Sequence, residues 1–249
     1  MLTINGILYV MFKKILISCI IWVVGSVLTV LFFFSILFFT AILYPFDKMR
    51  KIAHAHSFLW SDLLIALNPY WDIEISGLKN INKTKTYVIV ANHQSLTDII
   101  LLYQTNMQFK WIANEHLFRL PIVGWAMCLA KHIKLRKGKF ESIKKAYQEA
   151  AAWLRRGMSV SIFPEGTRGN ADGMKEFQNG AFKLAIKEQV PILPISIKGT
   201  SAAIPRGTWL FTTKVPVRMK ILEPINTAGL GLDDFEKLRD SVRAKIELA

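Results

Sequence analysis

Residues 87–98 read Tyr87-Val88-Ile89-Val90-Ala91-Asn92-His93-Gln94-Ser95-Leu96-Thr97-Asp98, and the chain changes character twice within this stretch. The first five residues form an apolar run that is typical of a buried strand. Ser95 is a good N-cap residue, and Asp98 stands three residues later, where a capping box places an acid. Apolar residues at helical spacing follow. The stretch therefore predicts a strand, a tight loop and a helix.

His93 lies in this predicted loop, five residues before Asp98. Within one continuous helix the two side chains would stand roughly 140° apart, so they meet only if His93 precedes the helix and the loop folds back. A carboxylate that holds an imidazole fixes its tautomer and stabilises the imidazolium. Because no G-x-S-x-G or similar nucleophile motif occurs, we predict that His93 is a general base acting on a substrate hydroxyl. The alternative is that Asp98 only caps the helix.

Strands and helices alternate from residue 71 to the end, which predicts an α/β domain over residues 71–249. We expect a mixed central sheet flanked by helices. The predicted strands are Trp71–Ser76, Tyr87–Ala91, Phe109–Ala113, His132–Arg136, Ser159–Phe163, Ile192–Lys198 and Val217–Leu222. The predicted helices are Leu96–Tyr103, Pro121–Ala130, Phe140–Arg155, Asn179–Lys187 and Asp233–Leu248. Sites in open α/β sheets usually lie beyond the carboxyl ends of strands, where His93 is expected.

A second motif, Phe163-Pro164-Glu165-Gly166-Thr167-Arg168-Gly169, follows another predicted strand. Pro164 cannot donate to a strand ladder, and Gly166 allows a sharp turn. The planar fork of Arg168 suits bidentate phosphate binding. Glu165 could orient that guanidinium or accept a hydrogen bond from a substrate hydroxyl. The alternative is a surface turn with an ion pair.

Five basic residues surround the predicted strand at 132–136, and two of them, Arg136 and Lys137, are adjacent. Successive side chains of a strand point to opposite faces, so these two cannot both face one site while the strand stays regular. We expect one of them to be functional and the rest to form a solvated or lipid-facing edge. The apolar segment Val190-Pro191-Ile192-Leu193-Pro194-Ile195 carries no reactive group and is expected to form core and wall.

The composition is both basic and apolar. The 249 residues include 32 Lys and Arg against 18 Asp and Glu, a net charge of +14, and 52% are hydrophobic. This combination favours an anionic membrane surface over nucleic acid as a partner, and no zinc-finger, Walker A or dinucleotide-binding glycine pattern occurs. The two cysteines, Cys19 and Cys128, lie in apolar stretches and have no metal-ligand spacing. We expect no disulfide between them, which fits a reducing cytoplasmic compartment for the folded part.

Residues 1–46 are predicted to anchor the chain in a membrane. Ile15 to Phe46 contain no charge over 32 residues, which exceeds the roughly 20 needed for one crossing and falls short of two. Basic residues at both ends favour a helical hairpin in one leaflet, bent near Gly25, and one long tilted span is the alternative. Residues 47–70 are predicted to form an amphipathic connector, with His54 and His56 on a solvated face rather than in a metal site.

With these motifs, the chain resembles the glycerophospholipid acyltransferase family, and within it the bacterial 1-acyl-sn-glycerol-3-phosphate (lysophosphatidic acid) acyltransferases. Asn92-His93 with Asp98 matches the block N-H-x-x-x-x-D of that family. The segment from Phe163 to Arg168 matches F-P-E-G-T-R, and the segment from Val190 to Pro194 matches V-P-I-x-P. The resemblance covers more than half of the chain.

The resemblance implies transfer of a fatty acyl group from acyl-CoA or acyl-carrier protein to the sn-2 hydroxyl of lysophosphatidic acid, giving phosphatidic acid. It implies neither a covalent enzyme intermediate nor a metal or redox cofactor. The implied partners are the bilayer, the lysophospholipid and the acyl donor, at the cytoplasmic face of a bacterial inner membrane. His93 is then the base with Asp98 as its partner, and the implied substrate-binding residues are Asn92, Arg136, Lys137, Glu165, Gly166, Thr167 and Arg168.

The chain departs from the family pattern at three places. Asn114 stands where the family often has lysine, and Gln178 and Asn179 replace a commoner lysine-containing F-K-x-G segment, so two positive charges are lost. Lys137 stands before Gly138 where the family often has arginine, which keeps the charge but not the planar fork. The losses leave a different lysolipid acceptor open, such as a lyso-aminolipid. Two further alternatives are a non-catalytic protein that binds anionic lipids and a membrane-attached hydrolase.

Overall fold

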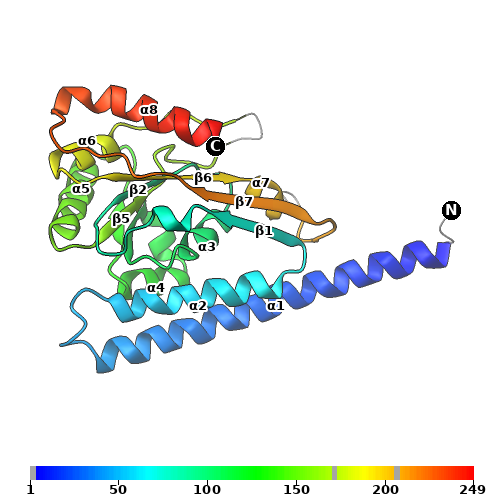
Figure 1. Ribbon diagram of the computed structural model, residues 1–249. Helices are drawn as coiled ribbons and strands as arrows, with labels where there is room; N and C mark the ends of the chain where they lie inside the picture. Colours follow the sequence, from blue (N-terminus) through cyan, green and yellow to red (C-terminus); the bar gives the residue numbers. More distant parts are fainter. Residues whose placement is uncertain (1–3, 170–172, 205–207) are drawn as a thin grey trace.

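In a computed structural model, which describes residues 4–169, 173–204 and 208–249, the chain folds around a mixed sheet (Figure 1). The described part holds seven strands in the order β1-β7-β6-β2-β5-β3-β4. All neighbours are parallel except β6 and β7. The strands are β1 (Trp71–Ser76), β2 (Val88–Ala91), β3 (Phe109–Asn114), β4 (Ile133–Leu135), β5 (Ser159–Ile162), β6 (Ile192–Lys198) and β7 (Val215–Ile221). The predicted α/β fold is confirmed.

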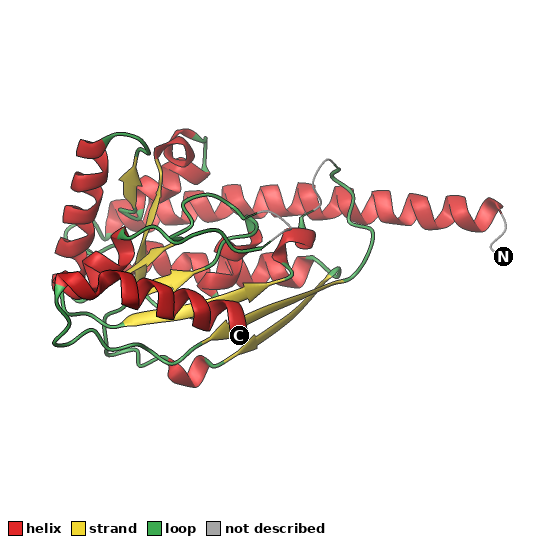
Figure 2. Cartoon of the chain, turned by 90° about the horizontal axis from the view of Figure 1, so that it is seen from above, coloured by secondary structure: helices red, strands yellow, loops and turns green. Residues whose placement is uncertain are grey.

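Helices cover both faces of the sheet (Figures 1 and 2). They are α1 (Ile4–Ile42), α2 (Lys51–Leu67), α3 (Thr97–Tyr103), α4 (Val123–Leu129), α5 (Phe140–Arg155), α6 (Gly180–Lys187), α7 (Thr200–Ala203) and α8 (Phe235–Leu248). Short 3-10 turns occur at η1 (Leu78–Asn80), η2 (Glu115–Arg119) and η3 (Leu232–Asp234). One core packs α5, α6 and α8 against the sheet, and the other packs α2 and α3 against the opposite face. Strands in the middle of the sheet, such as β2, are buried on both sides because helices cover both.

The N-terminal apolar segment forms one helix rather than a hairpin. Helix α1 runs through 39 residues without a break, and Gly25 and Ser26 stay helical, because Thr29 Oγ1 donates to the Gly25 carbonyl at 2.8 Å and the ladder continues. The predicted bend near Gly25 is therefore wrong, and the single-helix alternative describes the structure. Leu8–Ile42 has a mean hydropathy of 2.7, and it is the one stretch of the described residues long and apolar enough to cross a membrane.

The connector forms helix α2, which lies between α1 and the domain (Figure 1). Ser61 Oγ donates to the Ile100 carbonyl of α3 at 2.7 Å, and Trp60 Nε1 donates to Thr29 Oγ1 of α1 at 3.1 Å. The expectation that His54 lies on a solvated face is wrong. His54 is fully buried, and its ring packs edge-on against Phe109 at 4.7 Å.

The structure begins some helices and strands at other residues than the sequence predicts. Helix α4 begins at Val123 rather than at Pro121, because Ile122 has a φ of 65°, which breaks the helical path. Strand β7 begins at Val215, two residues early, because Val215 and Pro216 pair with β1. Turns η1 and η2 and helix α7 were not predicted, since a single turn is too short to show a period.

Candidate functional site

The two motifs lie side by side at one edge of the sheet. Strand β2 ends at Ala91 and strand β5 at Ile162, and these parallel neighbours pair with Val90 opposite Ile162. The carboxyl ends of parallel strands meet at one edge, where sites in α/β sheets usually lie. The loop that carries His93 therefore faces the loop that begins at Phe163.

His93 and Asp98 are in direct contact. His93 Nδ1 lies 2.8 Å from Asp98 Oδ2, and the same oxygen accepts hydrogen bonds from the backbone N–H groups of Gln94 at 2.6 Å and Ser95 at 2.8 Å. Asp98 is fully buried in the first turn of α3. Because an ionised carboxylate only accepts, Nδ1 carries the proton and Nε2 keeps its lone pair. The predicted contact is confirmed, whereas the catalytic roles of the two residues stay predictions.

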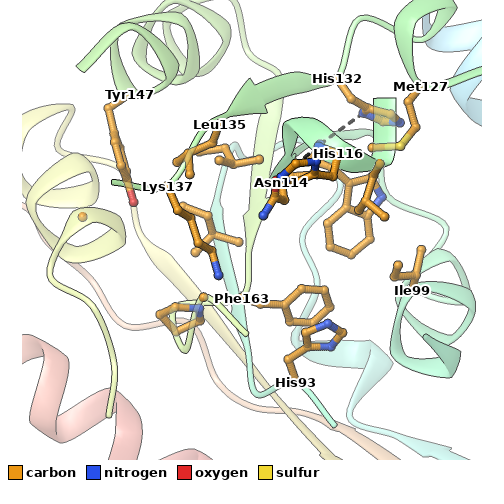
Figure 3. Close-up of a pocket in the computed structure, with 18 of the residues that line it drawn as sticks. His93, Ile99, Asn114, His116, Met127, His132, Leu135, Lys137, Tyr147 and Phe163 are labelled. Atoms are coloured by element: carbon orange, nitrogen blue, oxygen red, sulfur yellow. Dashed lines mark hydrogen bonds between the residues drawn. The ribbon is translucent and has the colours of Figure 1, made fainter. Parts of the chain in front are cut away.

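The imidazole is also held on one face by an aromatic stack. The rings of His93 and Phe163 have centroids 4.0 Å apart and planes within 12° of each other, and Phe163 stacks in turn on Trp111 at 5.3 Å. Figure 3 shows the His93 ring beside Phe163. The His93 side chain is 14% exposed. The role of Phe163 was not predicted, since the motif alone marks it only as the last residue of a strand.

Glu165 ties the two motif loops together through backbone contacts. Its Oε1 accepts from the His93 N–H at 2.7 Å, and its Oε2 accepts from the Lys175 N–H at 2.9 Å. The His93 carbonyl accepts in return from the Gly169 N–H at 2.7 Å. Burial raises the pKa of the Glu165 carboxyl, and the two N–H contacts oppose that rise. The expectation that Glu165 orients Arg168 is corrected: its carboxylate positions the His93 loop.

Asn92 has a similar structural role. Its Nδ2 donates to the Ile197 carbonyl at 2.7 Å, and its Oδ1 accepts from the Ile197 N–H at 2.8 Å. Asn92 is buried, and through these bonds the pairing of β2 with β6 continues past Ala91. Both ends of its amide are thus bonded to the neighbouring strand, and the substrate contact of Asn92 stays a prediction.

Of the two adjacent basic residues, Lys137 faces the site. Gly166 turns with a φ of 70°, and a Cβ placed on it would lie 3.5 Å from Lys137 Nζ, so the ammonium sits directly over the turn of the second motif. Burial and the charge of Lys175 lower the pKa of Lys137. Arg136 points elsewhere, with its Nε 3.2 Å from Glu115 Oε1. The prediction that one of the pair is functional fits Lys137, and the expected contact from Arg136 is corrected.

The remaining motif residues are exposed at the mouth of the site. Thr167 and Arg168 are exposed and line the same cavity as Lys137. Thr167 Oγ1 accepts from Lys175 Nζ at 3.0 Å. Gly166 leaves room above the turn for Lys137, and the prediction that these residues bind a phosphate stays a prediction.

Asn114, Gln178 and Asn179, which depart from the family pattern, make local structural contacts. Asn114 lines the cavity at the end of β3, and its Oδ1 accepts from the His116 N–H at 3.2 Å, which caps η2. The Gln178 N–H donates to the Pro164 carbonyl at 2.9 Å, and Asn179 Oδ1 accepts from an Arg239 guanidinium N–H at 2.6 Å. The start of α6 is thereby joined to the second motif.

A cavity of about 2100 Å³ opens at this edge of the sheet. Single small-molecule sites typically measure about 300–1,000 Å³, so the space suffices for two substrates. His93 lines it, and one arm of the lining includes residues of α1 and α4; Figure 3 shows His93 and, on α4, Met127. The lining of this apolar arm contains no Lys, Arg, Asp or Glu among the described residues. Its members are Thr29, Phe32, Phe33, Ile36, Leu96, Ile99, Leu117, Leu120, Ile122, Val123, Ala126 and Met127.

The other side of the cavity is cationic. Figure 3 shows Lys137 and Tyr147 across the cavity from Ile99 and Met127. Glu165 is the one carboxylate among the described lining residues. Six basic side chains line this side: Lys137, Lys144, Arg155, Arg168, Lys183 and Lys187. Among the residues that the structure describes, no three His, Cys, Asp or Glu side chains gather as a metal site requires. The arrangement offers an apolar compartment and an anion-binding compartment, with an imidazole lining the space between.

Comparisons with known proteins agree with this geometry. A 1-acyl-sn-glycerol-3-phosphate acyltransferase from Brassica napus chloroplasts is 33% identical over 203 residues, covering 81% of this chain and 57% of the relative. A chloroplast protein of the same name from Arabidopsis thaliana is 35% identical, covering 71% and 49%. This chain thus spans about half the length of these relatives.

A solved structure matches almost the whole chain. The crystal structure of the 1-acyl-sn-glycerophosphate acyltransferase PlsC from Thermotoga maritima superposes with a TM-score of 0.80 at 29% identity, covering 96% of this chain and 95% of that one. The acyltransferase family model matches residues 72–198, which include both motifs. The chain therefore belongs to the acyltransferase family.

Proposed function

We propose that this protein transfers a fatty acyl group from an acyl thioester, acyl-CoA or acyl-carrier protein, to the sn-2 hydroxyl of lysophosphatidic acid, giving phosphatidic acid. The observation that carries the proposal is the state of His93. Its Nδ1 is bound to Asp98 at 2.8 Å, which leaves Nε2 as a base in a cavity with one apolar and one cationic side. The names of the three relatives given above, each a 1-acylglycerol-3-phosphate acyltransferase, support the same acceptor.

In the proposed reaction, His93 Nε2 removes the proton from the acceptor hydroxyl as that oxygen attacks the thioester carbonyl carbon. Asp98 stabilises the imidazolium that forms. The tetrahedral intermediate then expels the thiolate, the C–S bond breaks, and the imidazolium returns the proton to the thiolate. No covalent enzyme intermediate is needed, and no step uses a metal or redox cofactor.

The two sides of the cavity suit the two ends of these substrates. The apolar arm takes an acyl chain, because each CH₂ removed from water contributes about 0.8 kcal/mol. Lys137 and Arg168 take the acceptor phosphate, which only two carbons and one oxygen separate from the attacking hydroxyl oxygen. This short separation requires cations close to His93, and Lys137 lies over the turn at Gly166, next to the His93 loop.

The proposal includes attachment to the cytoplasmic face of a bacterial inner membrane. Helix α1 is apolar over Leu8–Ile42, only 11% of its most apolar window is buried in the protein, and its 39 residues extend for about 58 Å. Such a helix exceeds the roughly 30 Å of a bilayer core, so it crosses at a tilt or lies partly in the interface. The acceptor and the product are both bilayer lipids, which gives the attachment its physical purpose.

The test is an incubation of the purified protein in lipid vesicles with lysophosphatidic acid and acyl-CoA or acyl-carrier protein. We expect phosphatidic acid by mass spectrometry, and we expect His93→Ala to lower its rate by about 10²–10⁴-fold while keeping the melting temperature. His56→Ala is the matched control, since His56 lies on α2 outside the cavity lining. Acylation of another lysolipid only, free fatty acid without acylated lipid, or no thioester-dependent product would each refute the proposal.

A further inference from the structure

Helices α5 and α6 both begin at the site and run away from it. Helix α5 begins at Phe140, three residues after Lys137, and α6 begins at Gly180, where the preceding Gln178 N–H is bonded to Pro164 of the second motif. Each helix connects parallel strands of the sheet, so both run antiparallel to the strands and parallel to each other. Their facing sides form a groove that continues the cavity.

One face of each helix lines this α5–α6 groove. On α5 the lining residues recur at intervals of three and four, which places them on one face, and they are Phe140, Ile143, Lys144, Tyr147, Gln148, Ala151 and Arg155. On α6 the lining residues are Gly180, Lys183, Leu184 and Lys187. Lys183 and Lys187 are one turn apart, about 6 Å along the helix. The far end is closed by Arg155, whose guanidinium binds Glu188 with two hydrogen bonds of 2.7 and 2.8 Å.

The groove carries three cations that have no ion-pair partner. Lys144, Lys183 and Lys187 are exposed, and no carboxylate lies within ion-pair distance of any of them in the part of the chain that the structure describes. Lys183 Nζ also lies over the Phe235 ring, 4.1 Å from its centroid. Lys144 follows the first residue of α5 by four positions, and Lys183 and Lys187 follow the first residue of α6 by three and seven. The cavity therefore has a near group of cations at the second motif and a far group along the two helices.

We propose that the α5–α6 groove binds the diphosphate and 3′-phosphate of CoA when acyl-CoA is the donor. This inference rests on the proposed function. The acceptor phosphate lies close to the reacting oxygen and belongs to the near cations. The first phosphate of acyl-CoA lies at the far end of the pantetheine arm from the thioester, so it requires cations at a second, greater distance. Lys144, Lys183 and Lys187 offer such cations along two helices that start at the site, and Lys187 stands about 10 Å along α6 from its first residue.

The position of the groove also favours a water-soluble nucleotide. Figure 1 shows α5 and α6 on the opposite face of the sheet from α1 and α2. The apolar arm reaches α1, and the groove leads the other way. The donor would thus lie across the site with its acyl chain on the lipid side. A groove between two helices fits a small extended molecule, since small-molecule sites are concave.

The experiment compares two donors and two charge-matched triple variants. The groove variant is Lys144→Gln/Lys183→Gln/Lys187→Gln. The control variant is Lys145→Gln/Lys220→Gln/Lys237→Gln, which removes the same charge from exposed lysines outside the lining. The donors are acyl-CoA and acyl-pantetheine, which lacks all three phosphates. Binding of desulfo-CoA, measured by calorimetry with the full-length protein in vesicles, gives a readout that needs no turnover.

We expect the groove variant to raise the KM for acyl-CoA and the Kd for desulfo-CoA about tenfold, since each exposed ion pair contributes about two- to fivefold. Its KM for acyl-pantetheine, and every constant of the control variant, should stay within twofold. Equal effects on both donors, or equal effects of both variants, would overturn the inference. If no donor gives product, the proposed function fails, and desulfo-CoA binding alone then decides whether the groove inference stands.

Discussion

Replacement of Asp98 by asparagine tests the negative charge beside the His93 imidazole separately from its hydrogen bonds. Asp98 Oδ2 accepts three hydrogen bonds, from His93 Nδ1 and from the N–H groups of Gln94 and Ser95. The asparagine oxygen can keep all three contacts, so the loop geometry is preserved. The negative charge is lost, and the amide NH₂ takes the place of Oδ1, which is buried and has no hydrogen-bond partner among the described residues.

The expected loss follows from the proposed mechanism. When His93 takes the proton, an imidazolium forms against the carboxylate, and two unit charges about 4 Å apart interact by about 4 kcal/mol at an effective dielectric constant near 20. The charge develops only in the transition state, so Asp98→Asn should lower kcat by about 10³-fold and leave both KM values nearly unchanged. Because the two N–H donors then bond to a neutral rather than a charged acceptor, the free energy of unfolding should also fall by about 1–3 kcal/mol.

The assay is steady-state acylation of lysophosphatidic acid in vesicles, with a thermal unfolding measurement on the same preparations. Asp62→Asn is the matched control, because Asp62 is exposed on α2 and bonded only to Gln104 among the described residues. A kcat for Asp98→Asn within tenfold of the parent protein would refute the claim that the Asp98 charge stabilises the imidazolium of His93. A loss confined to the acceptor KM would show instead that Asp98 serves binding.

Two further changes test other parts of the site. Lys137→Ala should raise the acceptor KM about tenfold, as expected for a charge-assisted hydrogen bond of roughly 1.5 kcal/mol, whereas Arg136→Ala should change it less than twofold; the reverse order would assign the phosphate to Arg136. Burial lowers the pKa of His132 to about 3. Since the unfolded pKa is about 6.5, the unfolded chain binds more protons between these values, and stability falls as the pH drops below 6.5, by up to about 1.4 kcal/mol per unit. His132→Asn should therefore show a smaller loss of melting temperature between pH 7 and pH 5 than the parent protein, and equal losses would contradict the role of burial.

The sequence was sufficient for the sheet because strand burial leaves a strong pattern. All seven predicted strands are present, including β2, whose four residues are apolar and fully buried. The strand order and the antiparallel pairing of β6 with β7 depend on contacts between distant segments, and no local pattern reports them. Turn η2 was missed for a different reason: it is a short turn capped by one local hydrogen bond, from the His116 N–H to Asn114 Oδ1, and it has no period to detect.

The site was predictable where its contacts are local. His93 and Asp98 are five residues apart, and the Asp98 carboxylate also accepts from the Gln94 and Ser95 N–H groups, which folds the loop back onto it. The predicted N-cap is wrong by one residue, since Leu96 rather than Ser95 precedes α3. The contacts of Asn92 and Glu165 could not be predicted, because their partners are backbone groups 105 and 72 residues away, at Ile197 and His93. Which polar side chains beside His93 hold its loop is therefore seen only from the tertiary contacts.

Helix α1 has a role beyond attachment, because it is also a wall of the cavity. Phe33 of α1 lines the apolar arm and packs against Trp125 of α4 with ring centroids 5.7 Å apart. Trp22 Nε1 donates to the Trp209 carbonyl at 2.8 Å, and Ser18 Oγ accepts from the Phe211 N–H at 2.9 Å, so a second stretch of α1 is also bonded to the domain. The compartment assigned to the acyl chain is therefore bounded in part by the helix for which we propose a place in the lipid. On that proposal, an acyl chain leaving the compartment past α1 would meet lipid rather than water, which would remove most of the hydrophobic cost of product release.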